Sequence, residues 1–173
     1  MKKYNKGLII IHWLIAVVVI AMLGGSFFLE DLPNAIRPTA IMLHKSFGLT
    51  ILFLMLIRLI WVIKAGKPAL PPTVPRWEMF LARGVQVALY VFMVTMTLAG
   101  WLMSVLSNHT PLWFGLLRMP LPGVSFNPVW AEWFFQVHQT IAWILILLIC
   151  LHIGGAIKHA LIDKDDVLES MLP

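Results

Sequence analysis

The stretch QVHQTIAWILILLICLH, residues 136–152, is almost wholly apolar, yet it has a histidine near each end, His138 and His152. It lies inside an apolar block over residues 131–157, and about 20 such residues are enough to cross a bilayer. An imidazole in a membrane segment is costly and usually functional. In an α-helix this separation gives a rise of about 21 Å and side-chain directions only about 40° apart. The stretch therefore predicts a membrane helix with one imidazole at each of two levels on one face.

The composition of the whole chain agrees with this interpretation. Of the 173 residues, 60% are hydrophobic and 12% are charged, against about 25% charged in a typical soluble domain. Three more apolar blocks are long enough to cross a bilayer, over residues 8–28, 40–63 and 80–106. The start of the chain resembles a signal peptide, but its apolar run is too long and lacks a small-residue cleavage site, so we expect a retained first span. We predict an all-α integral membrane four-helix bundle, up-down-up-down, forming a single domain over residues 1–173.

The positions of the basic residues predict how the spans are oriented, because Lys and Arg collect on the cytoplasmic side. The first and third connections contain only Arg37, Lys45 and Arg118. We therefore expect both termini in the cytoplasm. The net charge of +5 does not indicate nucleic-acid binding, because the basic residues stand in short clusters beside apolar blocks. The other ten Lys and Arg lie at the N-terminus, around the second connection and in the tail: Lys2, Lys3, Lys6, Arg58, Lys64, Lys67, Arg76, Arg83, Lys158 and Lys164.

Counting depth from each span boundary arranges four histidines in two pairs. His12 and His152 lie about 6–9 Å inside the cytoplasmic boundary, whereas His44 and His138 enter from the outer side at similar depths. His159 is the rival for the inner level, because it lies seven residues after His152 on nearly the same face, but it is shallower. His109 stands in a polar connection and is expected to be exposed. We predict the pairs His12–His152 and His44–His138.

Two facing imidazoles with no further ligand favour one kind of metal site. Zinc takes four protein ligands, or three and a water, and neither cysteine nor carboxylate stands at these levels. An iron whose equatorial positions are filled by a porphyrin needs only two axial imidazoles. The single cysteine also excludes covalent attachment through C-x-x-C-H. We therefore predict two non-covalent haem b groups, the inner iron ligated by His12 and His152, the outer by His44 and His138, and a role in electron transfer.

Small residues follow the predicted ligands at helical spacing. The residue four positions after each ligand lies one turn away on the same face, where a macrocycle needs room, although small residues also mediate helix packing. These four residues are Ala16, Gly48, Ala142 and Ala156.

Two charged residues stand at the predicted haem levels. Lys45 follows His44 directly, so it either contacts a haem propionate or an incoming anion, or anchors its span among the lipid headgroups. Arg58 lies 14 residues after His44, on the same face and at the inner level. It either pairs with a propionate of the inner haem or extends to the inner surface. Arg37 and Arg118 add positive charge on the outer side.

An ordered set of motifs resembles that of the bacterial cytochrome b561 family, small four-helix di-haem membrane proteins. The motifs are IHWLIAVVVIAM, RPTAIMLHKSFGLTILFLMLIRLIW, LYVFMVTMTLAGWLM and the histidine spacing H-x13-H-x6-H in the last segment, and together they cover nearly the whole chain. The resemblance implies the same four haem ligands. The chain departs from the family pattern at Gln86, where some relatives have histidine, and at Ser170, where the closing segment often reads R-M-x-P.

The resemblance also implies a function. It predicts a bacterial inner-membrane protein that exchanges electrons with ubiquinone, and in the best-defined relatives superoxide is oxidised to dioxygen on the outer side. At minimum we expect an electron carrier. One alternative is a cytochrome subunit that receives electrons from a redox protein partner, a larger dehydrogenase or hydrogenase. Another is a histidine-relay proton channel or metal transporter, which would be colourless.

Two features outside the spans carry weaker expectations. The connection PLWFGLLRMPLPG, residues 111–123, is expected to be a short amphipathic segment on the outer surface or an irregular loop. Several tryptophans near the span ends fit an interfacial aromatic belt. They are Trp13, Trp61, Trp77, Trp113, Trp130 and Trp133.

Overall fold

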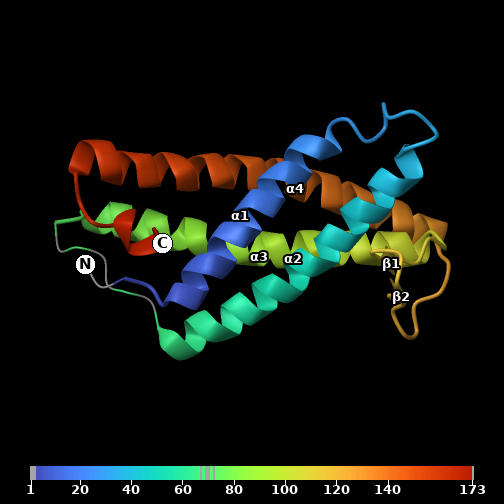
Figure 1. Ribbon diagram of the computed structural model, residues 1–173, viewed down its shortest axis with the longest axis horizontal. Helices are drawn as coiled ribbons and strands as arrows, with labels where there is room; N and C mark the ends of the chain where they lie inside the picture. Colours follow the sequence, from blue (N-terminus) through green and yellow to red (C-terminus); the bar gives the residue numbers. More distant parts are fainter. Residues whose placement is uncertain (1–2, 67, 69–70, 72, 173) are drawn as a thin grey trace.

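Four long helices make up most of the protein (Figure 1). The computed structural model describes residues 3–66, 68, 71 and 73–172. The helices of this part are α1 (Lys6–Ser26), α2 (Arg37–Ala65), α3 (Arg76–Leu106) and α4 (Pro128–Lys158), and their ends lie within four residues of the predicted spans. All four are long and apolar enough to cross a membrane. The prediction of an all-α four-helix bundle is confirmed.

Successive helices run in opposite directions, as Figure 1 shows. The start of α1, the end of α2, the start of α3 and the last described residues of the chain lie at one end of the bundle, and the connections 27–36 and 107–127 lie at the other. Helix α4 packs along α3, while α2 contacts both α1 and α3. The two ends of the bundle therefore differ: one carries the start of α1 and the last described residues, and the other carries the longest connection.

Local sequence explains where the helices begin and end. Asparagine side chains cap the N-termini of two of them. The side chain of Asn5 accepts the backbone N–H of Gly7 at the start of α1, and that of Asn127 accepts the backbone N–H of Trp130 at the start of α4. Helix α2 is followed by Gly66 as its C-terminal cap, and the positive φ of 74° at this position suits a residue without a side chain. Beyond α4 the chain forms a π-helical turn, η1 (His159–Asp163), and later a 3₁₀ turn, η2 (Glu169–Met171).

The connection between α3 and α4 contains a β-hairpin, so neither the expected amphipathic segment nor an irregular loop describes it. Strands β1 (Leu112–Trp113) and β2 (Leu117–Arg118) pair antiparallel, with Trp113 opposite Leu117. In the turn 114–116, the first two residues have positive φ values of 47° and 76°. Backbones in this conformation close tight hairpins.

A buried serine of α2 anchors this hairpin. Ser46 is fully buried, and its hydroxyl accepts the backbone N–H of Phe114 at 2.8 Å while donating to the carbonyl of Met42 at 2.7 Å. The indole N–H of Trp113 also donates to Thr50, one turn further along α2. The hairpin is thereby fixed against the N-terminal half of α2, because each of these hydrogen bonds would be lost if the hairpin moved away.

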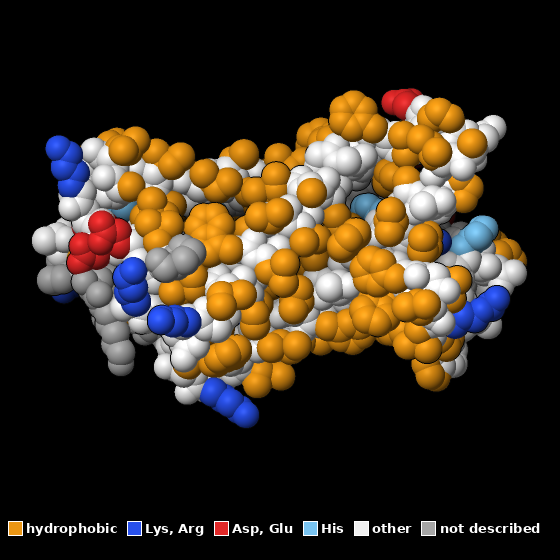
Figure 2. Space-filling view, in the orientation of Figure 1, with side chains coloured by type: hydrophobic (Ala, Val, Ile, Leu, Met, Phe, Trp, Pro, Cys, Tyr) orange, Lys and Arg blue, Asp and Glu red, His pale blue; other side chains and the backbone are white. Residues whose placement is uncertain are grey.

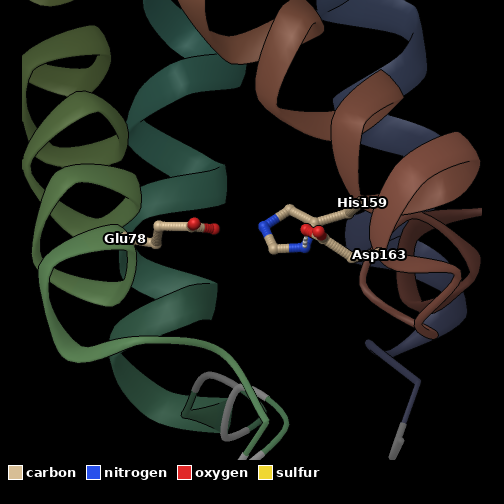
Figure 3. Close-up of side chains that lie close together, drawn as sticks. All are labelled: Glu78, His159 and Asp163. Atoms are coloured by element: carbon tan, nitrogen blue, oxygen red, sulfur yellow. Dashed lines mark ion pairs between the residues drawn. The ribbon is translucent and has the colours of Figure 1, made fainter.

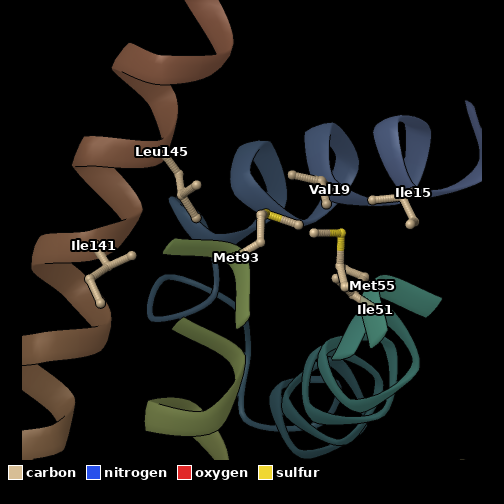
Figure 4. Packing of buried hydrophobic residues seen from close by; sticks show 7 residues of the cluster. All are labelled: Ile15, Val19, Ile51, Met55, Met93, Ile141 and Leu145. Carbon is tan, nitrogen blue, oxygen red and sulfur yellow. The ribbon is translucent and has the colours of Figure 1, made fainter. Parts of the chain in front are cut away.

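A hydrophobic core packs between the helices (Figure 4). On α4 its members Ile141 and Leu145 come between His138 and His152 in the sequence, and Leu145 is completely buried. On α4 these two apolar side chains therefore separate the two histidine levels, and Tyr90 is among the residues that pack against the core. The full cluster takes residues from all four helices: Ile15, Val19, Ile51, Met55, Met93, Ile141 and Leu145.

The outer surface of the bundle is apolar between its two ends. In Figure 2 the charged side chains of the visible face gather at the ends, and hydrophobic side chains cover the region between them. Residues such as Val17 and Ile63 expose 64% and 72% of their surface. In water such a surface would be unstable, whereas a bilayer covers it.

Candidate functional site

The four predicted ligands meet in two pairs that link different helices. The ring centres of His12 and His152 are 6.0 Å apart, and those of His44 and His138 are 6.2 Å apart. Two imidazoles that ligate one metal ion from opposite sides, with metal–nitrogen distances of about 2.0 Å, have ring centres about 6 Å apart. Both pairs therefore have the spacing of a bis-histidine metal site. One pair joins the start of α1 to the end of α4 and is here called the inner pair. The other joins α2 to α4 at the end of the bundle that carries the hairpin and is here called the outer pair.

Helix α3 fixes the imidazole of His138. Its Nδ1 lies 2.9 Å from the backbone carbonyl oxygen of Met96. A carbonyl can only accept a hydrogen bond, so Nδ1 carries the proton and donates it. The lone pair of Nε2 is then free for a metal ion. A backbone partner of this kind is the usual second contact of a metal-ligating histidine.

Gly100 gives His138 the space it occupies. A Cβ atom built on Gly100 would lie 2.9 Å from both Nδ1 and Cε1 of the His138 ring, closer than real Cβ contacts come. Sequence reasoning used this glycine only as part of a family motif and missed its role. The available signal was a glycine inside a helix, which costs about 1 kcal/mol relative to alanine and suggests a close approach.

The helix surface one turn after His44 has space that no side chain of the described residues fills. A Cβ at Gly48, one turn after His44, would contact only the methyl group of Met22, at 3.9 Å. The other three small residues of the predicted set, Ala16, Ala142 and Ala156, are half-buried. A cavity of about 570 Å³, here called the outer cavity, opens near this level between α2, α3 and the start of α4. Its polar lining residues are Lys45, Ser104, Ser107, His109 and Glu132.

Lys45 lies at the outer cavity, with its ammonium group 3.2 Å from the backbone carbonyl oxygen of His109. The hydroxyl of Ser104 donates to the same carbonyl. The side chain of Lys45 thus points toward the connection after α3, and the outer cavity has both this positive charge and the carboxylate of Glu132 at its wall. The side chain of His109 is exposed, as expected.

Arg58 lies in the bundle at the level of the inner pair. It lies 14 residues after His44 on α2, about 21 Å along the helix toward the end of the bundle at which His12 and His152 lie. One terminal nitrogen donates to the hydroxyl of Tyr90 at 2.8 Å. Its Nε–H is buried and has no hydrogen-bond partner among the residues that the structure describes. A buried donor without an acceptor is costly, so this atom indicates that a further group belongs here.

His159 is occupied elsewhere and does not face His12. Its Nδ1 lies 3.2 Å from a carboxylate oxygen of Asp163, at the end of η1, and 2.8 Å from one of Asp165, just after this turn. Figure 3 shows Glu78 of α3 directed toward the same place. The ammonium group of Lys158 bridges the carboxylates of Glu78 and Asp163 at 2.8 Å and 2.7 Å. A cation of the chain itself therefore pairs with these carboxylates.

The other residues that the sequence singled out, Arg37, Arg118 and Gln86, make contacts elsewhere. Arg37 donates twice to the carbonyl of Leu32 and so closes the connection before α2. Arg118 is exposed on β2. The amide oxygen of Gln86 accepts a hydrogen bond from Arg83 at 3.2 Å, near the start of α3. None of these contacts reaches a histidine of the two pairs.

The closing segment covers the inner end beside His12. The carbonyl of Met171 accepts the indole N–H of Trp13 at 2.7 Å, and the Trp13 ring packs edge-on against the His12 ring. Ser170, where relatives often have arginine, is buried, and its carbonyl accepts the backbone N–H of Tyr4 at 3.1 Å. Both hydrogen bonds use backbone carbonyl groups of the closing segment, so they do not depend on which side chain stands at position 170.

Comparisons with known proteins agree with the site. The family model described as prokaryotic cytochrome b561 matches residues 3–173. The chain is 28% identical over 163 residues to cytochrome b561 homolog 2 of Escherichia coli (strain K12), which covers 93% of this chain and 86% of that protein. It is 26% identical over 175 residues to cytochrome b561 homolog 1 of the same organism, a match that covers 100% of this chain and 98% of that protein. It is also 26% identical over 172 residues to a probable superoxide oxidase CybB of Yersinia pestis, covering 99% and 97%.

The apolar helices, the paired histidines and the match along the chain lead to one assignment. The protein belongs to the prokaryotic cytochrome b561 family and is a multi-pass bacterial membrane protein that binds haem b and takes part in electron transfer.

Proposed function

We propose that residues 1–173 form one domain with two haem b groups, the first ligated by His12 and His152 and the second by His44 and His138. The observation that carries the proposal is the spacing of the two pairs, 6.0 Å and 6.2 Å between ring centres. The tautomer of His138 and the unsatisfied donor of Arg58 support it. When bound, each haem supplies one-electron redox chemistry, because an iron with two axial imidazoles has no open position.

The proposed reaction oxidises superoxide on the outer side and reduces ubiquinone. Two superoxide anions each lose one electron and become dioxygen, and the quinone takes up these two electrons with two protons. The name of the Yersinia pestis relative, a probable superoxide oxidase, supports this choice of donor. The distribution of Lys and Arg supports an inner-membrane location with both termini in the cytoplasm.

Residues of the chain prepare the two sites for this reaction. Met96 and Gly100 keep His138 in place with Nε2 unprotonated. Lys45 lies at the wall of the outer cavity, where its positive charge would attract a small anion or hold a carboxylate of the outer haem. Arg58, with its unsatisfied Nε–H, would hold a carboxylate of the inner haem. The apolar core separates the two levels, with Ile141 and Leu145 between His138 and His152 on α4.

The first experiment measures haem per polypeptide in the purified chain by the pyridine haemochrome spectrum. We expect two haem b groups in the wild type, one in His44→Ala and two in the control His109→Ala, because His109 is exposed. Equal haem content in His44→Ala and the wild type would contradict the ligand assignment. A colourless wild type would return the proton channel or metal transporter to consideration.

The second experiment tests the reaction itself. Superoxide is generated enzymatically in the presence of the purified chain and a short-chain ubiquinone, and quinol formation is followed by absorbance. We expect quinol to form in proportion to superoxide and to be abolished in His44→Ala. Haem reduction only on addition of a dehydrogenase or hydrogenase would favour the alternative function, an electron-transfer subunit.

A further inference from the structure

Arg58 is a half-buried cation with a fully covered Nε–H, and no carboxylate of the described residues neutralises it. The ion pairs of this part of the chain involve Lys158 and His159 at the inner end, and none involves Arg58. A charge inside a bundle is stable only with a partner. Its Nε–H is fully covered, which also argues against extension of the side chain to the inner surface. A carboxylate that is not part of the polypeptide would satisfy both the charge and the donor.

Tyr90 of α3 determines where this guanidinium lies. Its hydroxyl accepts a hydrogen bond from Nη1 at 2.8 Å, and its ring centre is 5.4 Å from the central carbon of the guanidinium. These two contacts draw Arg58 sideways from α2 toward α3, at the level of His12 and His152. The hydroxyl proton of Tyr90 is also available for a second acceptor, since this oxygen uses only a lone pair for Arg58.

The outer pair lacks a comparable charge. The ammonium group of Lys45 donates to the carbonyl of His109, and the carboxylate of Glu132 lines the same cavity. The cation at the outer level is therefore partly balanced by neighbours and stands beside a cavity that water can enter. At the inner level, Arg58 is half-buried and its Nε–H is fully covered. Its charge therefore acts through a medium of lower dielectric constant and acts more strongly.

We propose that Tyr90 is a positioning residue that directs Arg58 against a carboxylate of the inner haem, and that this pair gives the inner haem a higher reduction potential than the outer one. The inference rests on the proposed ligand pairs. A positive charge near an iron stabilises its reduced form, because reduction lowers the charge of the iron by one. The difference in potential favours electron transfer from the outer level to the inner level.

The test is a redox titration of the purified full chain, with the reduced fraction followed in the α-band. We expect two components in the wild type, and the one absent from His152→Ala is the inner haem. In Arg58→Gln the reduced-to-oxidised ratio of the inner component should fall at least about tenfold at a fixed ambient potential, which is 59 mV for a one-electron couple. In Tyr90→Phe it should fall about threefold, the effect of one modest hydrogen bond.

Matched variants separate charge from position. Arg58→Lys keeps the charge but lacks the Nε–H, so its shift should be smaller than that of Arg58→Gln. Arg83→Gln removes a cation that contacts Gln86 and the carbonyl of Pro68, and it should move neither component. If Arg58→Gln fails to retain the inner haem, Tyr90→Phe and Arg58→Lys, which keep the charge, still decide the question.

Three results would overturn the inference. The first is an inner component that already titrates below the outer one in the wild type. The second is unchanged potentials in both Tyr90→Phe and Arg58→Gln. The third is unchanged potentials with a raised KM for quinone in Arg58→Gln, which would assign the guanidinium to the quinone. A wild type with fewer than two haem groups would instead refute the proposed ligand pairs.

Discussion

Replacing Gly100 by alanine should remove or loosen the haem of the outer pair while sparing the inner one. The added Cβ would lie 2.9 Å from Nδ1 and Cε1 of His138, and ordinary contact begins at 3.4 Å. The imidazole must therefore move by about 0.5 Å, or α3 must move away from α4. Forcing an extra methyl group into a packed site costs about 1–3 kcal/mol.

This displacement is large on the scale of metal ligation. Metal–ligand distances in proteins stay within about 0.2 Å of their usual values. The ring also cannot move freely, because Nδ1 is hydrogen-bonded to the carbonyl of Met96 at 2.9 Å. A shift of about 0.5 Å must lengthen this hydrogen bond, the metal–nitrogen bond or both, and a loss of 1.4 kcal/mol corresponds to a tenfold weaker outer haem.

The assay is haem content per polypeptide, combined with the α-band spectrum of the reduced protein. The matched control is Gly84→Ala on the same helix, because a Cβ at Gly84 would meet no heavy atom of the described chain within 4 Å. We expect two haem groups in the control and a loss approaching one haem in Gly100→Ala. Two fully bound haem groups with unchanged spectra and potentials in Gly100→Ala would refute the reasoning, since the ring of His138 could not then lie against Gly100.

Three further predictions concern other parts of the chain. His12→Ala and His152→Ala should each remove the same haem, whereas His159→Ala should leave haem content unchanged in the pyridine haemochrome assay, because His159 contacts carboxylates rather than the inner pair. Lys45→Gln should lower the rate of superoxide-driven quinone reduction several-fold at low salt and less at high salt, since screening weakens attraction of an anion. Ser46→Ala should destabilise the protein by about 1–3 kcal/mol in thermal unfolding, because a buried N–H of the hairpin loses its acceptor.

Several features of the protein follow from properties that are local in the sequence. The four spans are long apolar runs, and a bilayer imposes both their length and their helical structure. Once these spans alternate in direction, position along each span gives depth. The separation of His138 and His152 on one helix was therefore sufficient to predict two levels, and the structure brings both predicted pairs to about 6 Å.

Other features depend on how the helices rotate and tilt against one another, which hydropathy does not encode. The approach of Gly100 to His138 and the bond between Arg58 and Tyr90 join residues that are 38 and 32 positions apart and lie on different helices. The β-hairpin was also missed, because its strands have only two residues each and their place depends on Ser46 of a distant helix. Apolar length thus determined the depth of each ligand, and the lateral packing of side chains alone decided which neighbours fix it.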